Sequence, residues 1–116
     1  MLQQTIANAF FKDPSLAGVA LARRIRDAST VIDGCNAESD GFDLRNVLRD
    51  VGVTSPASSV YVNVDEMRKV RLDEIAEDLW SIWRPSADDI EIFDDSLSWI
   101  LSIDHDGNVL ILWSLR

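Results

Sequence analysis

An uninterrupted apolar run near the end of the chain, residues 109–113 (VLILW), constrains the fold more than any other segment. A run without polar alternation favours a strand that lies inside a sheet and is covered on both faces. Residues 104–107 (DHDG) precede it and have turn chemistry, with Gly107 where a left-handed backbone is needed. We therefore expect a C-terminal hairpin of strands 97–103 and 108–115.

Two shorter strands are expected upstream of this hairpin. Residues 60–64 (VYVNV) alternate β-branched side chains, and residues 90–93 (IEIF) are a short apolar stretch with one charge. Residues 33–41 (DGCNAESDG) have turn chemistry throughout, so we expect a loop there.

Three helices are expected in the first half of the chain. Residues 2–11 have apolar side chains at helical spacing. The next helix spans residues 14–28, with Asp13 as its cap and Pro14 at its first position. A short helix over residues 42–51 would end at Gly52.

A longer central helix is expected over residues 66–83, capped by Asp65 and ended by Pro85. Its predicted core-facing stripe consists of Leu72, Ile75, Ala76, Leu79 and Trp83. Together these elements predict a single α+β domain over residues 1–116. In it, N-terminal helices and one central helix pack on a mostly antiparallel sheet of about four strands that ends in the C-terminal hairpin.

The negative charge is concentrated in the second half of the chain. The formal net charge is −9, and residues 59–116 contribute −8 of it, from 5 basic and 13 acidic side chains. Such a surface repels bare nucleic acid, which binds through Lys and Arg, whereas it attracts a basic protein. The same charge is also expected if it serves only to keep the protein soluble.

The composition also bears on the compartment. One cysteine, Cys35, cannot form an internal disulfide, which suits a reducing compartment. Residues 1–14 have neither the basic region nor the apolar core of a secretion signal. The apolar run 109–113 is too short to cross a membrane. We therefore predict a cytoplasmic protein with no membrane contact.

No catalytic, metal or cofactor motif is complete. His105 lies in the predicted turn between Asp104 and Asp106, where neighbouring side chains usually point into solvent. The turn fails the calcium-loop pattern because Gly107 comes too early and Leu115 stands where the last ligand belongs. Nothing places Cys35 near His105 as a nucleophile pair. We expect no catalytic residue, no metal and no cofactor.

Two acidic groups are candidates for binding a cationic partner. The densest group brackets the strand 90–93, and the other lies on the predicted central helix beside Trp80, whose predicted position is partly exposed. Tryptophan is enriched at binding hot spots, so we include Trp80 with the acids. The candidate partner-binding residues are Asp88, Asp89, Glu91, Asp94, Asp95, Asp73, Glu74, Glu77, Asp78 and Trp80.

The acids of residues 88–95 admit other interpretations. Charges on a solvated edge strand deter edge-to-edge aggregation, and paired carboxylates can hold a divalent metal. Of the remaining tryptophans, Trp99 and Trp113 are expected in the core because they lie on predicted inner strands.

The segment 88–112 (DDIEIFDDSLSWILSIDHDGNVLIL) resembles small bacterial immunity proteins, the cytoplasmic antidotes of polymorphic or contact-dependent toxins. An acidic strand is followed by a D-x-S-L-x-W strand, with Asp94, Ser96, Leu97 and Trp99, and then by an apolar hairpin. The resemblance implies a non-enzymatic inhibitor that occludes the active or substrate-binding surface of a cognate toxin, many of which are basic nucleases.

Three alternatives remain open at this point. A phage-type DNA mimic is also small and acidic, although Arg68, Lys69, Arg71 and Arg84 are interleaved with the acids here. A small metal-dependent enzyme could use the carboxylates or His105. A subunit of a larger assembly could use the apolar N-terminal segment around Phe10 and Phe11.

Overall fold

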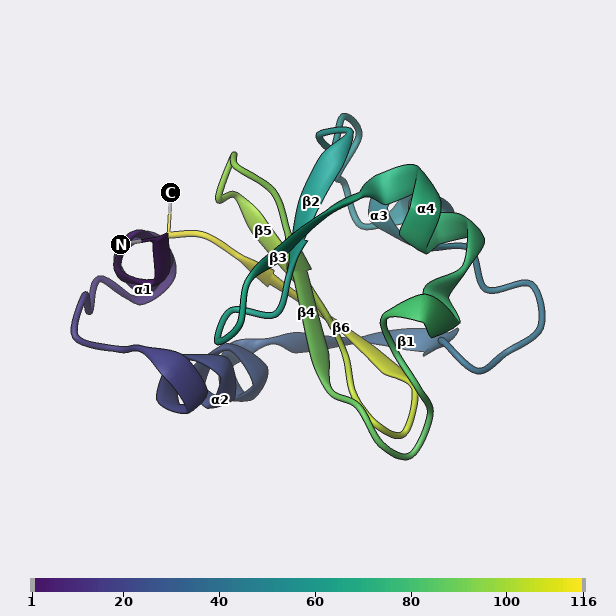
Figure 1. Ribbon diagram of the computed structural model, residues 1–116, viewed down its shortest axis with the longest axis horizontal. Coiled ribbons are helices and arrows are strands. Elements are labelled where there is room, and N and C mark those ends of the chain that lie inside the picture. The colour runs from purple at the N-terminus through teal and green to yellow at the C-terminus, as the bar shows by residue number, and fades with distance from the viewer. Residues whose placement is uncertain (1, 116) are drawn as a thin grey trace.

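The computed structural model describes residues 2–115 as helices packed on an open antiparallel sheet (Figure 1). The helices are α1 (Leu2–Phe11), α2 (Gly18–Ala28), α3 (Leu44–Asp50), α4 (Leu72–Glu77) and the 3₁₀ helix η1 (Leu79–Ser81). The strands are β1 (Thr30–Asn36), β2 (Ser59–Val62), β3 (Arg68–Arg71), β4 (Ile90–Phe93), β5 (Trp99–Ile103) and β6 (Asn108–Trp113). The α+β class is therefore confirmed.

The six strands lie in the order β1-β6-β5-β4-β2-β3, and each neighbouring pair is antiparallel. The predicted hairpin is β5–β6, paired from Trp99 with Trp113 to Ile103 with Val109. Its turn is closed by the Gly107 amide, which donates to the Asp104 carbonyl at 3.0 Å. The φ angle of Gly107 is +83°, and a Cβ there would lie 2.3 Å from Asn36 Oδ1, so a larger residue would be strained and would displace the Asn36 side chain.

The prediction of about four strands is wrong by two, because β1 and β3 were missed. β1 occupies residues 30–36, part of which was predicted as loop. Its turn-forming residues are accommodated by an irregularity in the pairing with β6 between Val31 and Asn36, with Gly34 at a φ of +72°. A bulged edge strand does not show the period-2 pattern by which strands are recognised.

The predicted helix over residues 66–83 is wrong in its first and last thirds, because the α-helix ends at Glu77 and a separate 3₁₀ helix, not a continuation up to Pro85, follows at Leu79–Ser81. Residues 68–71 pair with β2 as strand β3, with Val60 opposite Val70, and a helix forms only over Leu72–Glu77. The Asp65 carboxylate accepts the neighbouring Glu66 amide and caps no helix. Pairing with an existing strand has overridden the local helix propensity. The predicted stripe is confirmed as core: Leu72, Ile75, Leu79 and Trp83 are buried, and Ala76 is half-buried.

The sheet is covered on both faces by separate apolar clusters. Leu101 and Trp99 of β5 join the cluster under α3 and α4, whereas Ile100, between them, joins the cluster under α1 and α2. Figure 1 shows the two pairs of helices on opposite sides of the sheet. Alternate residues of one strand therefore pack into two different apolar clusters, which explains why β5 and much of β6 lack polar alternation.

Two further details differ from expectation. α2 begins at Gly18, not at Pro14, and the Gly18 amide donates to Gln3 Oε1 of α1, while Asp13 accepts the Ser15 amide. Trp113 is 44% exposed and not in the core, although its strand partner Trp99 is buried. Within residues 2–115 no helix is both long enough and apolar enough to cross a membrane.

Candidate partner-binding surface

The acids of residues 88–95 do not form one exposed face. β4 lies between β5 and β2, and all four of its residues are buried. The interpretation of residues 90–93 as a solvated edge strand is therefore wrong. Glu91 and Asp94 are only 5% and 4% exposed, so neither carboxylate belongs to an exposed acidic face.

Asp94 has a structural role at the end of β4. Its Oδ2 accepts the Ala57 amide at 3.1 Å, and its Oδ1 accepts the Ser96 amide at 3.0 Å together with the Ser96 hydroxyl. The carboxylate thus ties the turn between β4 and β5 to the connector that precedes β2. Asp94 and Ser96 of the D-x-S sequence therefore form this turn.

Glu91 lies on the face of β4 that α1 and α2 cover. Its Oε1 accepts the Val64 amide at 3.1 Å. Burial raises the pKa of Glu91 to about 7; the Val64 hydrogen bond lowers it, the Asp65 charge raises it, and the Arg26 charge lowers it. Near neutral pH this carboxyl group is therefore only partly ionised.

Asp88, which is half-buried, and Asp95, which is exposed, are paired with basic side chains of the same molecule. Asp88 Oδ2 lies 3.6 Å from Arg84 Nε, and Asp95 Oδ2 lies 3.9 Å from Lys69 Nζ. These are surface pairs, which contribute little to stability because solvent screens them. They nevertheless reduce the charge that a partner would meet.

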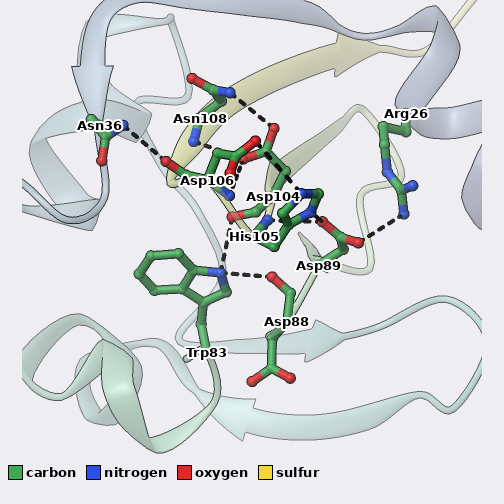
Figure 2. Close-up of polar contacts among 9 residues, drawn as sticks. All are labelled: Arg26, Asn36, Trp83, Asp88, Asp89, Asp104, His105, Asp106 and Asn108. Carbon is green, nitrogen blue, oxygen red and sulfur yellow. Dashed lines mark hydrogen bonds and ion pairs between the residues drawn. The ribbon is translucent and has the colours of Figure 1, made fainter. Parts of the chain in front are cut away.

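Asp89 connects α2 to the β5–β6 turn (Figure 2). Its Oδ2 lies 3.7 Å from Arg26 Nη2, and its Oδ1 lies 3.1 Å from His105 Nδ1 and accepts the His105 amide at 2.9 Å. This pair was not predicted, since in the sequence His105 has only Asp104 and Asp106 as acidic neighbours. Asp89 and His105 are 16 positions apart, and no local pattern links them.

The Asp89–His105 pair shifts the titration of both groups. The hydrogen bond to Asp89, then the Asp106 and Asp89 charges, raise the pKa of His105 above its ordinary value. Burial raises the pKa of Asp89, but hydrogen bonds from the His105 side chain and backbone and the Arg26 charge outweigh it and leave that pKa lowered. The pair acts as a surface link between two loops.

The loop before β4 is fixed to the same turn by Trp83. Figure 2 shows its indole nitrogen, which donates to the Asp88 carbonyl at 3.0 Å and to the Asp104 carbonyl at 3.2 Å. The Ser86 amide also donates to the His105 carbonyl at 2.7 Å. Trp83 is fully buried, as the sequence predicted. It lies three residues after Trp80 and so fixes the end of the segment on which Trp80 is exposed.

The acids of α4 and η1 differ from those of residues 88–95. Asp73, Glu74, Glu77 and Asp78 are all exposed. Asp73 is bonded to Arg45 of α3. Among residues 2–115, no Lys, Arg or His side chain forms an ion pair with Glu74, Glu77 or Asp78. We call Glu74, Glu77, Asp78 and Trp80 the α4 surface.

Trp80 is 61% exposed, the second most exposed large apolar side chain in the described chain after Val19. Its ring stands edge-on to the buried ring of Trp83, with centroids 6.3 Å apart and planes at 65°. It also borders a cavity of about 470 Å³, which Glu66 and Arg68 line on the β2–β3 side. Trp80 is thus an exposed aromatic side chain held by a rigid neighbour.

Cys35 and His105 form no contact with each other among the described residues. Cys35 lines a cavity of about 460 Å³ between β1 and α3, with Phe42 and Asp50, and His105 is not among the lining residues. Burial, and then the Asp50 charge, raise the pKa of the Cys35 thiol, which lowers the fraction of reactive thiolate. In the part of the chain that the structure describes, no three His, Cys, Asp or Glu side chains lie where they could hold a metal ion together.

Comparison with known proteins finds no match for this chain among family models, curated proteins or solved structures.

Proposed function

We propose that this protein is a non-enzymatic inhibitor that neutralises a cognate basic bacterial toxin by covering the toxin's active or substrate-binding surface. The observation that carries the proposal is the α4 surface, where exposed Trp80 stands beside three exposed carboxylates that form no ion pair with any described residue.

An anchor of this kind suits a tight protein complex. A tryptophan gives a large contact area with few freely rotating bonds, and such residues dominate many interfaces. Trp80 is already positioned by Trp83, so little side-chain freedom would be lost on binding. The exposed carboxylates of Glu74, Glu77 and Asp78 precede it on the same short segment and supply negative charge for a cationic partner.

The net charge of the whole protein also favours a basic partner. A net charge of −9 accelerates encounter with a basic surface, and the acceleration falls as salt increases. A toxin that acts on a polyanion such as nucleic acid needs a basic substrate-binding surface. An acidic protein that occupies that surface excludes the substrate.

The test uses a basic protein encoded beside the gene for this chain. We expect its expression to stop growth and co-expression of the inhibitor to restore growth. Changing Glu74, Glu77 and Asp78 together to lysine should lower the association rate at least tenfold at low salt. The matched control changes exposed acids elsewhere, Asp27→Lys, Glu38→Lys and Asp40→Lys, by the same total charge.

If the association rate falls equally in both triple variants, net charge alone explains the attraction, and the assignment of the α4 surface as the interface is wrong. Inhibition of several unrelated DNA-binding proteins, with no effect on the neighbouring gene product, would instead favour a DNA mimic.

Trp80→Ala tests the anchor separately from the charge. Truncating a hot-spot tryptophan should raise the dissociation constant roughly a hundredfold or more, mainly through faster dissociation. Trp113→Ala, at the other exposed tryptophan of the described chain, is the matched control and should leave the constant within a factor of about three. Equal losses for the two variants would remove Trp80 from the interface.

A further inference from the structure

A polar cavity of about 340 Å³ lies between α2 and the start of β4 and is distinct from the α4 surface. Val19, Ala22 and Ala87 form its apolar wall. Its charged lining consists of two guanidinium groups, Arg23 and Arg26, and four carboxyl groups, Asp65, Asp88, Asp89 and Glu91. The lining is therefore acidic by two charges when all six groups are ionised.

Glu91 is the one buried carboxyl group of this lining, and its charge is not matched. Among the described residues its Oε1 accepts only the Val64 amide, its Oε2 accepts no hydrogen bond, and no cationic side chain lies within ion-pair distance. Arg26 is paired with Asp89 instead. A buried carboxylate without a cation is costly, and proteins usually satisfy it with a partner or by protonation.

A second buried polar group lies beside Glu91. Ser102 of β5 is directly opposite Glu91 in the sheet, so the two side chains are neighbours on the same face. Ser102 is 5% exposed, and its hydroxyl oxygen has no hydrogen-bond partner in the described chain. Glu91 and Ser102 are thus two neighbouring buried polar groups with unused bonding capacity, and of the two Glu91 lines the cavity.

We propose that this cavity receives one cationic side chain of the protein partner, whose head group pairs with Glu91. The inference rests on the proposed function, because it requires a partner with a basic surface. The apolar wall suits the aliphatic stem of Lys or Arg, which packs along apolar surface while its charge is bonded elsewhere. Val19 at the rim is 66% exposed and offers a first contact for that stem.

An anion fits the cavity less well. Arg23 forms no ion pair with a described residue and could attract one. An anion would, however, face the carboxylates of Asp65, Asp88 and Asp89 on entry and Glu91 at the base. A cation meets the opposite field along the same path.

Binding of a cation to ionised Glu91 must release a proton wherever that group is otherwise protonated. The charged groups that face Glu91 are Arg23 and Arg26 from α2, Asp65 after β2, and Asp88 and Asp89 before β4. We would follow the Glu91 carboxyl carbon by ¹³C NMR across pH in the full chain. The probes are N-acetyl-arginine amide and N-acetyl-lysine amide, with neutral N-acetyl-citrulline amide and inorganic phosphate as controls.

At ten times its dissociation constant, a cation that binds only ionised Glu91 lowers the apparent pKa by about one unit. We expect this from the arginine or the lysine probe, and the probe with the larger effect identifies the preferred head group. Citrulline should give no shift. Absence of a shift with both cations, an equal shift with citrulline, or binding of phosphate in their place would overturn the proposal.

Variants separate the cavity from the rest of the surface. Glu91→Gln should abolish the probe-induced shifts of the Val64 and Ala22 amides, whereas Glu74→Gln, on the α4 surface, should retain them. Retention in Glu91→Gln would overturn the proposal. These probes need no toxin, so the cavity experiment is independent of the experiments on Trp80 and the α4 surface. If the cavity binds no cation, the proposed function is still tested by the Trp80 and α4 variants. If those variants have no effect, the measured binding of a cation in the cavity is unaffected.

Discussion

The two acidic groups of this protein have similar density in the sequence but differ in burial and ion pairing in the fold. The acids of residues 88–95 surround a strand in the middle of the sheet, and they are buried or paired with Arg26, Arg84, Lys69 and His105. The acids around α4 lie on a short amphipathic helix, and three of them face solvent without an ion pair in the described chain.

The density of acidic residues in a sequence therefore does not measure the charge on the surface. A carboxylate on a central strand is used for hydrogen bonding or becomes partly protonated, whereas one on the outer side of a helix keeps its charge. The comparison can be tested by changing the same residue types in both groups.

The largest effect is expected at Asp94. Asp94→Ala leaves the Ala57 and Ser96 groups without their acceptor and should destabilise the fold by about 3 to 5 kcal/mol. Urea unfolding measures it, and neighbouring Asp95→Ala is the control, with a change under about 0.5 kcal/mol. Equal effects at the two positions would show that Asp94 is no more structural than a surface acid.

Glu91 should give an effect of the opposite sign. Its pKa in the fold, about 7, lies above the ordinary 4.5, so the folded state holds the extra proton and stability falls as pH rises between those values. Glu91→Gln removes this loss and should stabilise the protein by about 2 to 3 kcal/mol at pH 8. At pH 4.5 the variant should match the original chain. A stabilisation that is the same at both pH values would contradict the assignment.

A smaller, pH-dependent effect is expected at His105. Its pKa in the fold is raised by Asp89, so the pair stabilises the fold fully below about pH 6.5 and loses this contribution as pH rises through the raised value. His105→Ala should therefore lower the melting temperature at pH 5.5 and have less effect at pH 8.5. Asp89→Asn should remove most of the pH dependence of that difference, and its persistence would show that Asp106 is the main partner.

The smallest effect on stability is expected on α4. Changing Glu74, Glu77 and Asp78 to lysine breaks no ion pair among residues 2–115 and should alter the unfolding free energy by less than about 1 kcal/mol. Urea unfolding at moderate salt measures this change. A large destabilisation would mean that these acids stabilise the fold, and the two acidic groups would then not differ in their structural role.

The parts of the fold that could be predicted are those with strong local patterns. The run at residues 109–113, the turn at Gly107 and the stripe from Leu72 to Trp83 all led to correct placements in the core or the hairpin. β3 could not be predicted, because residues 66–71 have helix-compatible composition and become a strand only through pairing with β2. Trp113 was wrongly expected in the core, since a position on an inner strand does not determine how far a side chain is covered.

The sequence predicted which residues carry the negative charge, but not which of their side chains are buried. Exposure of Trp80 and the α4 acids followed from helix periodicity, which survives even though the helix is shorter than expected. Burial of Glu91 and Asp94 depends on strand order, and strand order requires long-range pairing that local patterns do not contain. The Asp89–His105 contact is invisible for the same reason.

The position of β1 beside β6 has a consequence for synthesis on the ribosome. β1 emerges early, yet its neighbour in the sheet arrives late, and Asn36 contacts Asp106 across 70 positions. Until then Leu21 and Ile25 of α2 lack the strand surface, including Ile100, that covers them. Nascent chains that stall before residue 108 should therefore be open to proteases and chaperones, because long-range pairing completes the domain only at its last strand.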